Sequence, residues 1–92
     1  MEFDLGTTVV AIPEQVSCDL AGEAAVLCLR SGVYYGLNSV SARIWSLVQT
    51  PTKVEVLLES ILAEYEVAPA DCQADLQRVL GELVSHGLLV RV

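Results

Sequence analysis

The spacing of apolar and polar residues divides the chain into a strand-rich first part and a helical second part. Before position 38, β-branched, aromatic and aliphatic residues gather in short runs that turn-forming residues interrupt. The predicted extended segments are Thr7–Ile12, Val16–Leu20, Ala24–Arg30 and Val33–Leu37. Pro13 limits the first segment because proline cannot donate to a strand ladder. Ala21-Gly22-Glu23 makes a turn, and Ser31-Gly32 joins the last two segments into a hairpin.

After position 38 the apolar residues recur at the spacing of amphipathic helices. Three helices are predicted. The first is Ser39–Gln49, the second is capped by Thr50 or Thr52 and ends near Val67, and the third begins at Pro69 and is terminated by Gly87. Asn38 or Ser39 is expected to cap the first helix. The expected buried stripes are Val54, Leu57, Leu58, Ile61 and Leu62, then Cys72, Leu76, Val79, Leu80 and Leu83.

These elements predict an α+β fold with the proportions of a winged helix-turn-helix, in which a three-stranded antiparallel sheet is followed by three helices. Residues 1–92 are few enough for one domain. Leu88–Val92 is expected to return as a short strand. Trp45 is expected to anchor the core, since a stacking platform usually needs several exposed aromatic residues among basic ones. Arg43 is expected to make no more than a surface ion pair.

The pleat of the segment Val33–Leu37 predicts which of its side chains face the core. Alternate residues of a strand point to opposite faces. Leu37 leads directly into a helix and is expected in the core, which places Tyr35 inward or at the rim. Tyr34 and Gly36 are then expected on the outer face.

The same stretch carries a family resemblance. Tyr-Tyr-Gly-Leu-Asn at 34–38, followed by Ser-Ala-Arg-Ile-Trp-Ser-Leu-Val at 41–48, resembles the hallmark of the PqqD-like family, and Ser-His-Gly-Leu-Leu at 85–89 also fits it. These small domains recognise peptides in the biosynthesis of ribosomally made, post-translationally modified peptides (RiPPs). The chain is similar in size to the free-standing leader-binding proteins of lasso-peptide pathways. The resemblance implies the same fold.

The resemblance also implies a site, in which the leader of a precursor peptide joins the sheet as a further strand and lies against the third helix. It points to Val33, Tyr34, Tyr35 and Gly36 for backbone pairing, to Leu76 and Val79 as pocket floor, and to Asp71 and Asp75 as an acidic rim for a Lys or Arg of the leader. Lasso-pathway leaders typically present a tyrosine and a proline there. The alternative is that the two apolar residues are plain core and the two aspartates a solvated face.

Composition and charge narrow the function classes. The net charge is −7, from 12 acidic side chains against 5 Lys and Arg. Affinity for nucleic acid depends on cations that replace phosphate counterions, so a nucleic-acid binder is disfavoured. An acidic surface attracts cationic partner segments or simply maintains solubility. Hydrophobic residues form 53% of the chain, which leaves some apolar surface for a partner.

Candidate catalytic and metal-binding residues are sparse. His86 is the only imidazole and precedes a glycine at a helix end, where it is expected to cap carbonyls rather than transfer protons. Cys18, Cys28 and Cys72 lack metal-ligand spacing, so each is interpreted as a small buried hydrophobe. We therefore expect no enzyme activity, no metal and no cofactor.

The leading hypothesis is a non-catalytic protein that binds a leader region and delivers the precursor to a leader peptidase, with contact to the cyclase left open. A winged-helix DNA-binding regulator and a module that dimerises through the same strand are the alternatives. The first residues lack the basic region of a signal peptide, and no apolar run is long enough to cross a membrane. A cytoplasmic location is expected.

Overall fold

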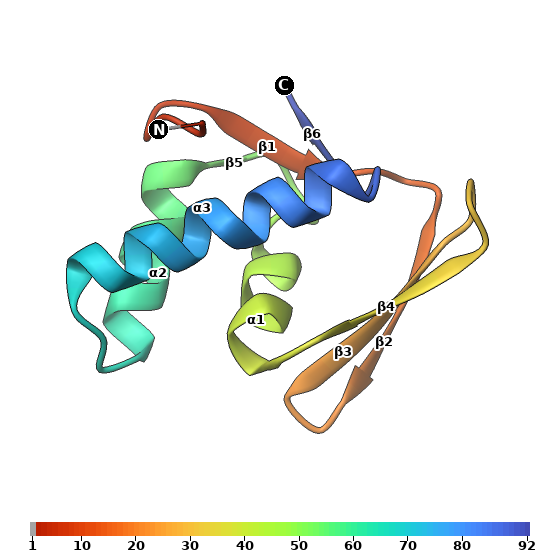
Figure 1. Ribbon diagram of the computed structural model, residues 1–92, viewed down its shortest axis with the longest axis horizontal. Coiled ribbons are helices and arrows are strands. Elements are labelled where there is room, and N and C mark those ends of the chain that lie inside the picture. The colour runs from red at the N-terminus through yellow and green to blue at the C-terminus, as the bar shows by residue number, and fades with distance from the viewer. Residues whose placement is uncertain (1) are drawn as a thin grey trace.

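The computed structural model describes residues 2–92 and contains three helices and six strands (Figure 1). Their order is β1 Thr8–Ala11, β2 Gln15–Leu20, β3 Glu23–Cys28, β4 Val33–Leu37, α1 Ser39–Leu47, β5 Thr52–Lys53, α2 Val54–Glu64, α3 Pro69–Ser85 and β6 Leu89–Arg91. Within residues 2–92 no helix is long and apolar enough to cross a membrane.

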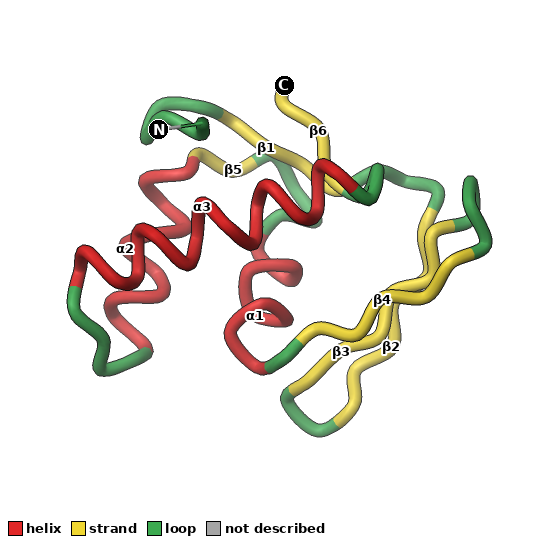
Figure 2. The backbone as a smooth tube through the Cα atoms, in the orientation of Figure 1, coloured by secondary structure: helices red, strands yellow, loops and turns green. Residues whose placement is uncertain are grey.

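The strands form two antiparallel sheets, with the orders β2-β3-β4 and β5-β1-β6. The first is the expected three-stranded sheet, and with the helices that follow it confirms the α+β class. The second sheet was not expected, because β1 pairs with strands far away in the sequence: Val9 lies opposite both Thr52 and Arg91. Winged helix-turn-helix is therefore a loose description of this fold. Figure 2 shows the two sheets at separate places around the helices.

Local turn and cap signals give the expected element boundaries in most places. Ala21 and Gly22 have φ of 54° and 90° between β2 and β3, where a tight hairpin turn needs positive φ. The Asn38 side chain accepts a hydrogen bond from the Ser41 N–H at 2.9 Å and caps α1. Gly87 has φ of 74° after the last residues of α3, as a helix terminator should.

The expected threonine cap of the second helix is wrong. Lys53 occupies that N-cap position and its side chain makes no capping bond. Thr52 belongs to β5, and its hydroxyl donates instead to the carbonyl oxygens of Leu47 and Thr50, both at 2.9 Å. The threonine thus ties the end of α1 to the strand before α2.

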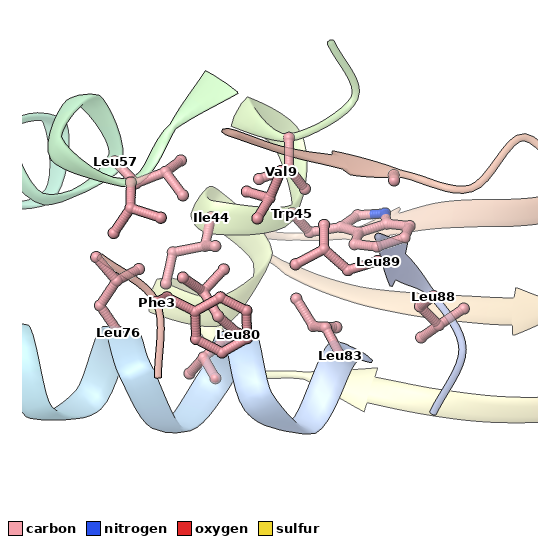
Figure 3. Packing of buried hydrophobic residues seen from close by; sticks show 14 of the residues in the cluster. Phe3, Val9, Ile44, Trp45, Leu57, Leu76, Leu80, Leu83, Leu88 and Leu89 are labelled. Atoms are coloured by element: carbon pink, nitrogen blue, oxygen red, sulfur yellow. The ribbon is translucent and has the colours of Figure 1, made fainter. Parts of the chain in front are cut away.

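The core lies where the three helices meet the two sheets (Figure 3). Trp45 is only 3% exposed, and its indole N–H donates to the Ser17 hydroxyl at 2.8 Å, which confirms it as an anchor. Cys28 and Cys72 are buried as expected. The expectation is wrong for Cys18, which is exposed because it lies on the edge strand β2, whose residues from Val16 to Leu20 are all exposed.

The sheet β2-β3-β4 has one covered face and one open face. The register aligns Ser17, Val26 and Tyr35 across the covered face, where Val26 is fully buried. It aligns two rows across the open face, termed here the outer face: Val16, Leu27 and Tyr34, and Cys18, Ala25 and Gly36. In Figure 1 the three helices lie on one side of this sheet. The predicted phase of β4 is confirmed, because Tyr34 is 71% exposed while Tyr35 and Leu37 pack against the core.

Candidate functional site

Strand β4 is an open edge of its sheet. It pairs with β3 on one side and is last in the order β2-β3-β4. In an antiparallel ladder, the N–H and C=O groups of successive residues point alternately to the two neighbouring strands. The Leu29 N–H donates to the Glu14 carbonyl oxygen at 3.0 Å, next to β2. The backbone N–H and C=O groups of every second residue before Leu29 in β3 therefore also point toward β2. Val26 is not one of these residues, so its backbone groups point toward β4.

This alternation fixes which amides of β4 are free. Val26 lies opposite Tyr35, so the Tyr35 backbone is directed toward β3. Tyr34 and Gly36 are the alternate residues and turn their N–H and C=O groups to the open edge. These groups are the donors and acceptors that an added strand would use.

Helix α3 lies beside this edge, and between them is a hollow of about 180 Å³, termed here the β4 hollow. Its walls come from the end of β4, the start of α1 and the second half of α3: Tyr35, Gly36, Leu37, Asn38, Ser41, Arg78, Val79, Glu82, Leu83 and His86. The rings of Tyr35 and His86 stack with centroids 4.2 Å apart, which joins the strand to the end of α3. The open edge and the hollow together form a groove.

A second, smaller hollow of about 50 Å³ lies further toward the start of α3 and is termed here the apolar hollow. Its walls are Val40, Ile44, Ile61, Tyr65, Val67, Cys72, Asp75 and Leu76. Burial raises the pKa of the Cys72 thiol, and the negative charge of Asp75 adds to that effect, so this thiol stays protonated and apolar. A small apolar side chain suits this hollow.

Charge in the groove is concentrated on α3. The Arg78 guanidinium lies 3.0 Å from a Glu82 carboxylate oxygen and 4.0 Å from an Asp75 oxygen. All three side chains are more than half exposed, so these ion pairs contribute little to folding stability and can exchange partners at low cost. The rim therefore offers one cation and two anions to a bound chain.

The structure brings most of the predicted site residues to this groove. Val33, Tyr34 and Gly36 are exposed on the edge strand, and Tyr35 lies at the rim. The other predicted residues lie on α3. Leu76 and Val79 are 2% and 3% exposed, so they are core residues whose surfaces also floor the two hollows. Asp75 lines the apolar hollow, whereas Asp71, one turn earlier, is exposed outside both hollows.

The sequence reasoning missed the groove residues on the last turns of α3. Arg78, Glu82 and His86 follow one another at i, i+4 and i+8, so they share one stripe of the helix with the groove. That spacing was visible in the sequence, but the strand that faces it was not. His86 is the C-cap residue of α3 by its backbone N–H, which donates to the Glu82 carbonyl oxygen, but its ring stacks on Tyr35 rather than serving as the expected side-chain cap.

The arrangement suits the binding of an extended peptide. Such a peptide would pair with Tyr34 and Gly36 and place alternate side chains in the hollows beside α3. Among residues 2–92, no group of three or more His, Cys, Asp or Glu side chains is placed to hold a metal ion.

Comparison with known proteins identifies relatives. No curated protein sequence matches the chain. The solved structure of TbiB1 in complex with the TbiA(beta) leader peptide is similar, with a TM-score of 0.81 and 34% identity over 87% of this chain and 93% of that one. Lasso peptide synthetase B1 complexed with the leader peptide has the same fold, with a TM-score of 0.77 and 23% identity over 89% and 96%. The family described as coenzyme PQQ synthesis protein D (PqqD) matches residues 23–89, so the chain belongs to the PqqD family.

Proposed function

We propose that this protein is a non-catalytic RiPP recognition element that binds the leader region of a ribosomally made precursor peptide, in lasso-peptide or related biosynthesis in the cytoplasm. The leader adds to β4 as a fourth strand and lies in the groove beside α3. The observation that carries this proposal is the open edge of β4, with two free backbone positions next to a hollow on α3. The two similar structures, both of leader-peptide complexes, support it.

We propose further that the protein delivers the bound precursor to a leader peptidase, which docks on the outer face. Antiparallel sheets with one solvated face usually carry polar residues there. Here Val16, Leu20 and Tyr34 are 56%, 54% and 71% exposed, and Glu23 is the charged residue at its corner. An exposed apolar patch of a few hundred Å² is typical of interaction sites.

The position of the outer face, on the same sheet as the open edge of β4, favours an enzyme partner over a second copy of the chain. A leader strand added to β4 would extend the same sheet and present its own alternate side chains on this face. The enzyme would thus contact the protein and the leader together.

Binding of the synthetic leader from the precursor encoded beside this gene tests the first proposal. Fluorescence anisotropy of the labelled peptide is expected to saturate at submicromolar protein, with a scrambled leader and a DNA duplex as controls. The alternative of a DNA-binding regulator finds little support, because both carboxylates beside Arg78 on α3 oppose phosphate contacts. Saturable, salt-sensitive binding to the duplex without leader binding would overturn the proposal.

Cleavage assays with the leader peptidase of the same pathway test the delivery step. Val16→Lys places a charge on the outer face, and Val56→Lys is the matched control on α2, where the side chain is 43% exposed. We expect the first variant to keep its leader affinity and to lose most stimulation of cleavage, and the second to retain both. Equal stimulation by the two variants would exclude the outer face as the docking surface.

A further inference from the structure

A larger hollow lies on the other side of α1 from the groove that the open edge of β4 forms with the β4 hollow. It measures about 520 Å³ and opens between α1 and the turn end of the β2–β3 hairpin, so it is termed here the hairpin hollow. Its walls are Ser17, Cys18, Asp19, Gly22, Glu23, Ala24, Ser39, Ala42, Arg43, Trp45, Ser46, Gln49 and Tyr65. Nothing in the strand-addition site accounts for it.

The walls of the hairpin hollow combine aromatic surface with unbalanced negative charge. Tyr65, which is half-buried, is the aromatic wall of the hollow, whereas Trp45 is only 3% exposed there. The one cation there, Arg43, is held by both carboxylate oxygens of Glu64 at 3.0 Å. Asp19 and Glu23 have no ion-pair partner among residues 2–92. Aromatic faces and free carboxylates both attract a cation, so the hollow is suited to a Lys or Arg side chain.

The hairpin hollow adjoins the hollows of the groove beside α3. Tyr65 is a wall of both the hairpin hollow and the apolar hollow. The first turn of α1 touches all three hollows: Ser39 lines the hairpin hollow, Val40 the apolar hollow and Ser41 the β4 hollow. The three hollows therefore follow one another around the start of α1.

Strand direction decides which part of a bound leader reaches this end. Every pairing in the sheet is antiparallel, and β4 runs from Val33 to Leu37 before it enters α1. A leader that also pairs antiparallel runs in the opposite direction to β4. Its residues upstream of the paired segment therefore lie near Leu37 and the first turn of α1, while its downstream residues leave past Val33.

From this placement we infer that the hairpin hollow is a second subsite for the precursor, which receives a basic side chain located upstream of the strand-forming segment. This inference rests on the proposed leader binding. The upstream chain passes the apolar hollow and Tyr65, and its Lys or Arg then lies beside Asp19, while Glu23 adds negative charge from the other face of the hairpin end. The subsite selects leaders by charge at a distance from the paired strand.

The test compares two lengths of the leader encoded beside this gene, one complete and one starting at the strand-forming segment. The variant Asp19→Asn/Glu23→Gln removes the two free carboxylates. Its matched control, Glu55→Gln/Glu59→Gln, removes two exposed carboxylates from α2. We expect the first variant to bind the complete leader about three to ten times more weakly at low salt, an effect that shrinks in high salt. Binding of the truncated leader should not change.

The outcomes separate the subsite from the function on which it rests. Unchanged affinity of Asp19→Asn/Glu23→Gln for the complete leader would overturn the subsite and leave leader binding intact. The subsite would also be overturned if Asp19→Asn/Glu23→Gln lost equal affinity for the complete and the truncated leader. The same holds if the α2 control lost as much affinity for the complete leader as Asp19→Asn/Glu23→Gln does. Failure of the unmodified protein to bind either leader would overturn both proposals.

Discussion

A proline at position 34 is a sharp test of strand addition, because it removes one edge-facing N–H. By the alternation of the ladder, the Tyr34 amide points away from β3 and toward the open edge of the sheet. Proline is tolerated on an edge strand where the missing N–H faces solvent, so Tyr34→Pro should fold. Tyr34→Ala is the control, since it removes the ring and keeps the N–H.

The expected loss follows from one backbone hydrogen bond. A net contribution of about 0.5–1.5 kcal/mol corresponds to about two to twelve times weaker binding of the leader, beyond any loss in Tyr34→Ala. Anisotropy titrations of the labelled leader measure this difference, and circular dichroism checks that both variants are folded. Equal affinity of Tyr34→Pro and Tyr34→Ala would refute pairing of the leader with the Tyr34 amide.

Three further predictions concern the scaffold. Ala21→Asn should raise the free energy of unfolding by up to about 1 kcal/mol in urea titrations, because asparagine tolerates the left-handed φ of 54° better than alanine does. Ser17→Ala should cost about 1 kcal/mol and change tryptophan emission, because it leaves the buried indole N–H unpaired. The hydrogen bond from Arg30 at 3.0 Å lowers the pKa of Glu14 below its ordinary value of 4.5, so its stabilising effect is present above that pH and lost as the pH falls through the lowered pKa. Arg30→Gln should raise the pKa of the Glu14 carboxyl in an NMR titration, because the largest cause of its lowering is removed, and an unchanged titration would contradict this cause.

Local signals in the sequence predicted the parts of the fold that local chemistry determines. The start of α1 was predictable from Asn38 and the end of α3 from Gly87, because cap and terminator chemistry acts within a few residues. The phase of β4 was also predictable, because Leu37 had to enter the core at the start of α1 and the pleat then placed Tyr34 outside.

Long-range pairing was not predictable in the same way. β1 joins β5 and β6, which lie about 40 and 80 residues later in the chain, and no local pattern specifies these partners. The same limit applies to the site. The sequence shows Arg78 and His86 on one helix stripe, but only the packing of α3 beside β4 makes that stripe a groove. Cys18 was misjudged because a cysteine on a strand does not reveal which face is covered.

Amide hydrogen exchange with and without the leader tests the central claim most directly. In the free protein we expect Tyr34 and Gly36 to exchange quickly and Tyr35, which faces β3, to exchange slowly. A saturating leader should slow exchange at Tyr34 and Gly36 and change Tyr35 little, because only the edge-facing amides gain partners. Protection of α3 residues alone, with fast exchange persisting at Tyr34 and Gly36, would show that the leader binds without joining the sheet and would contradict the account.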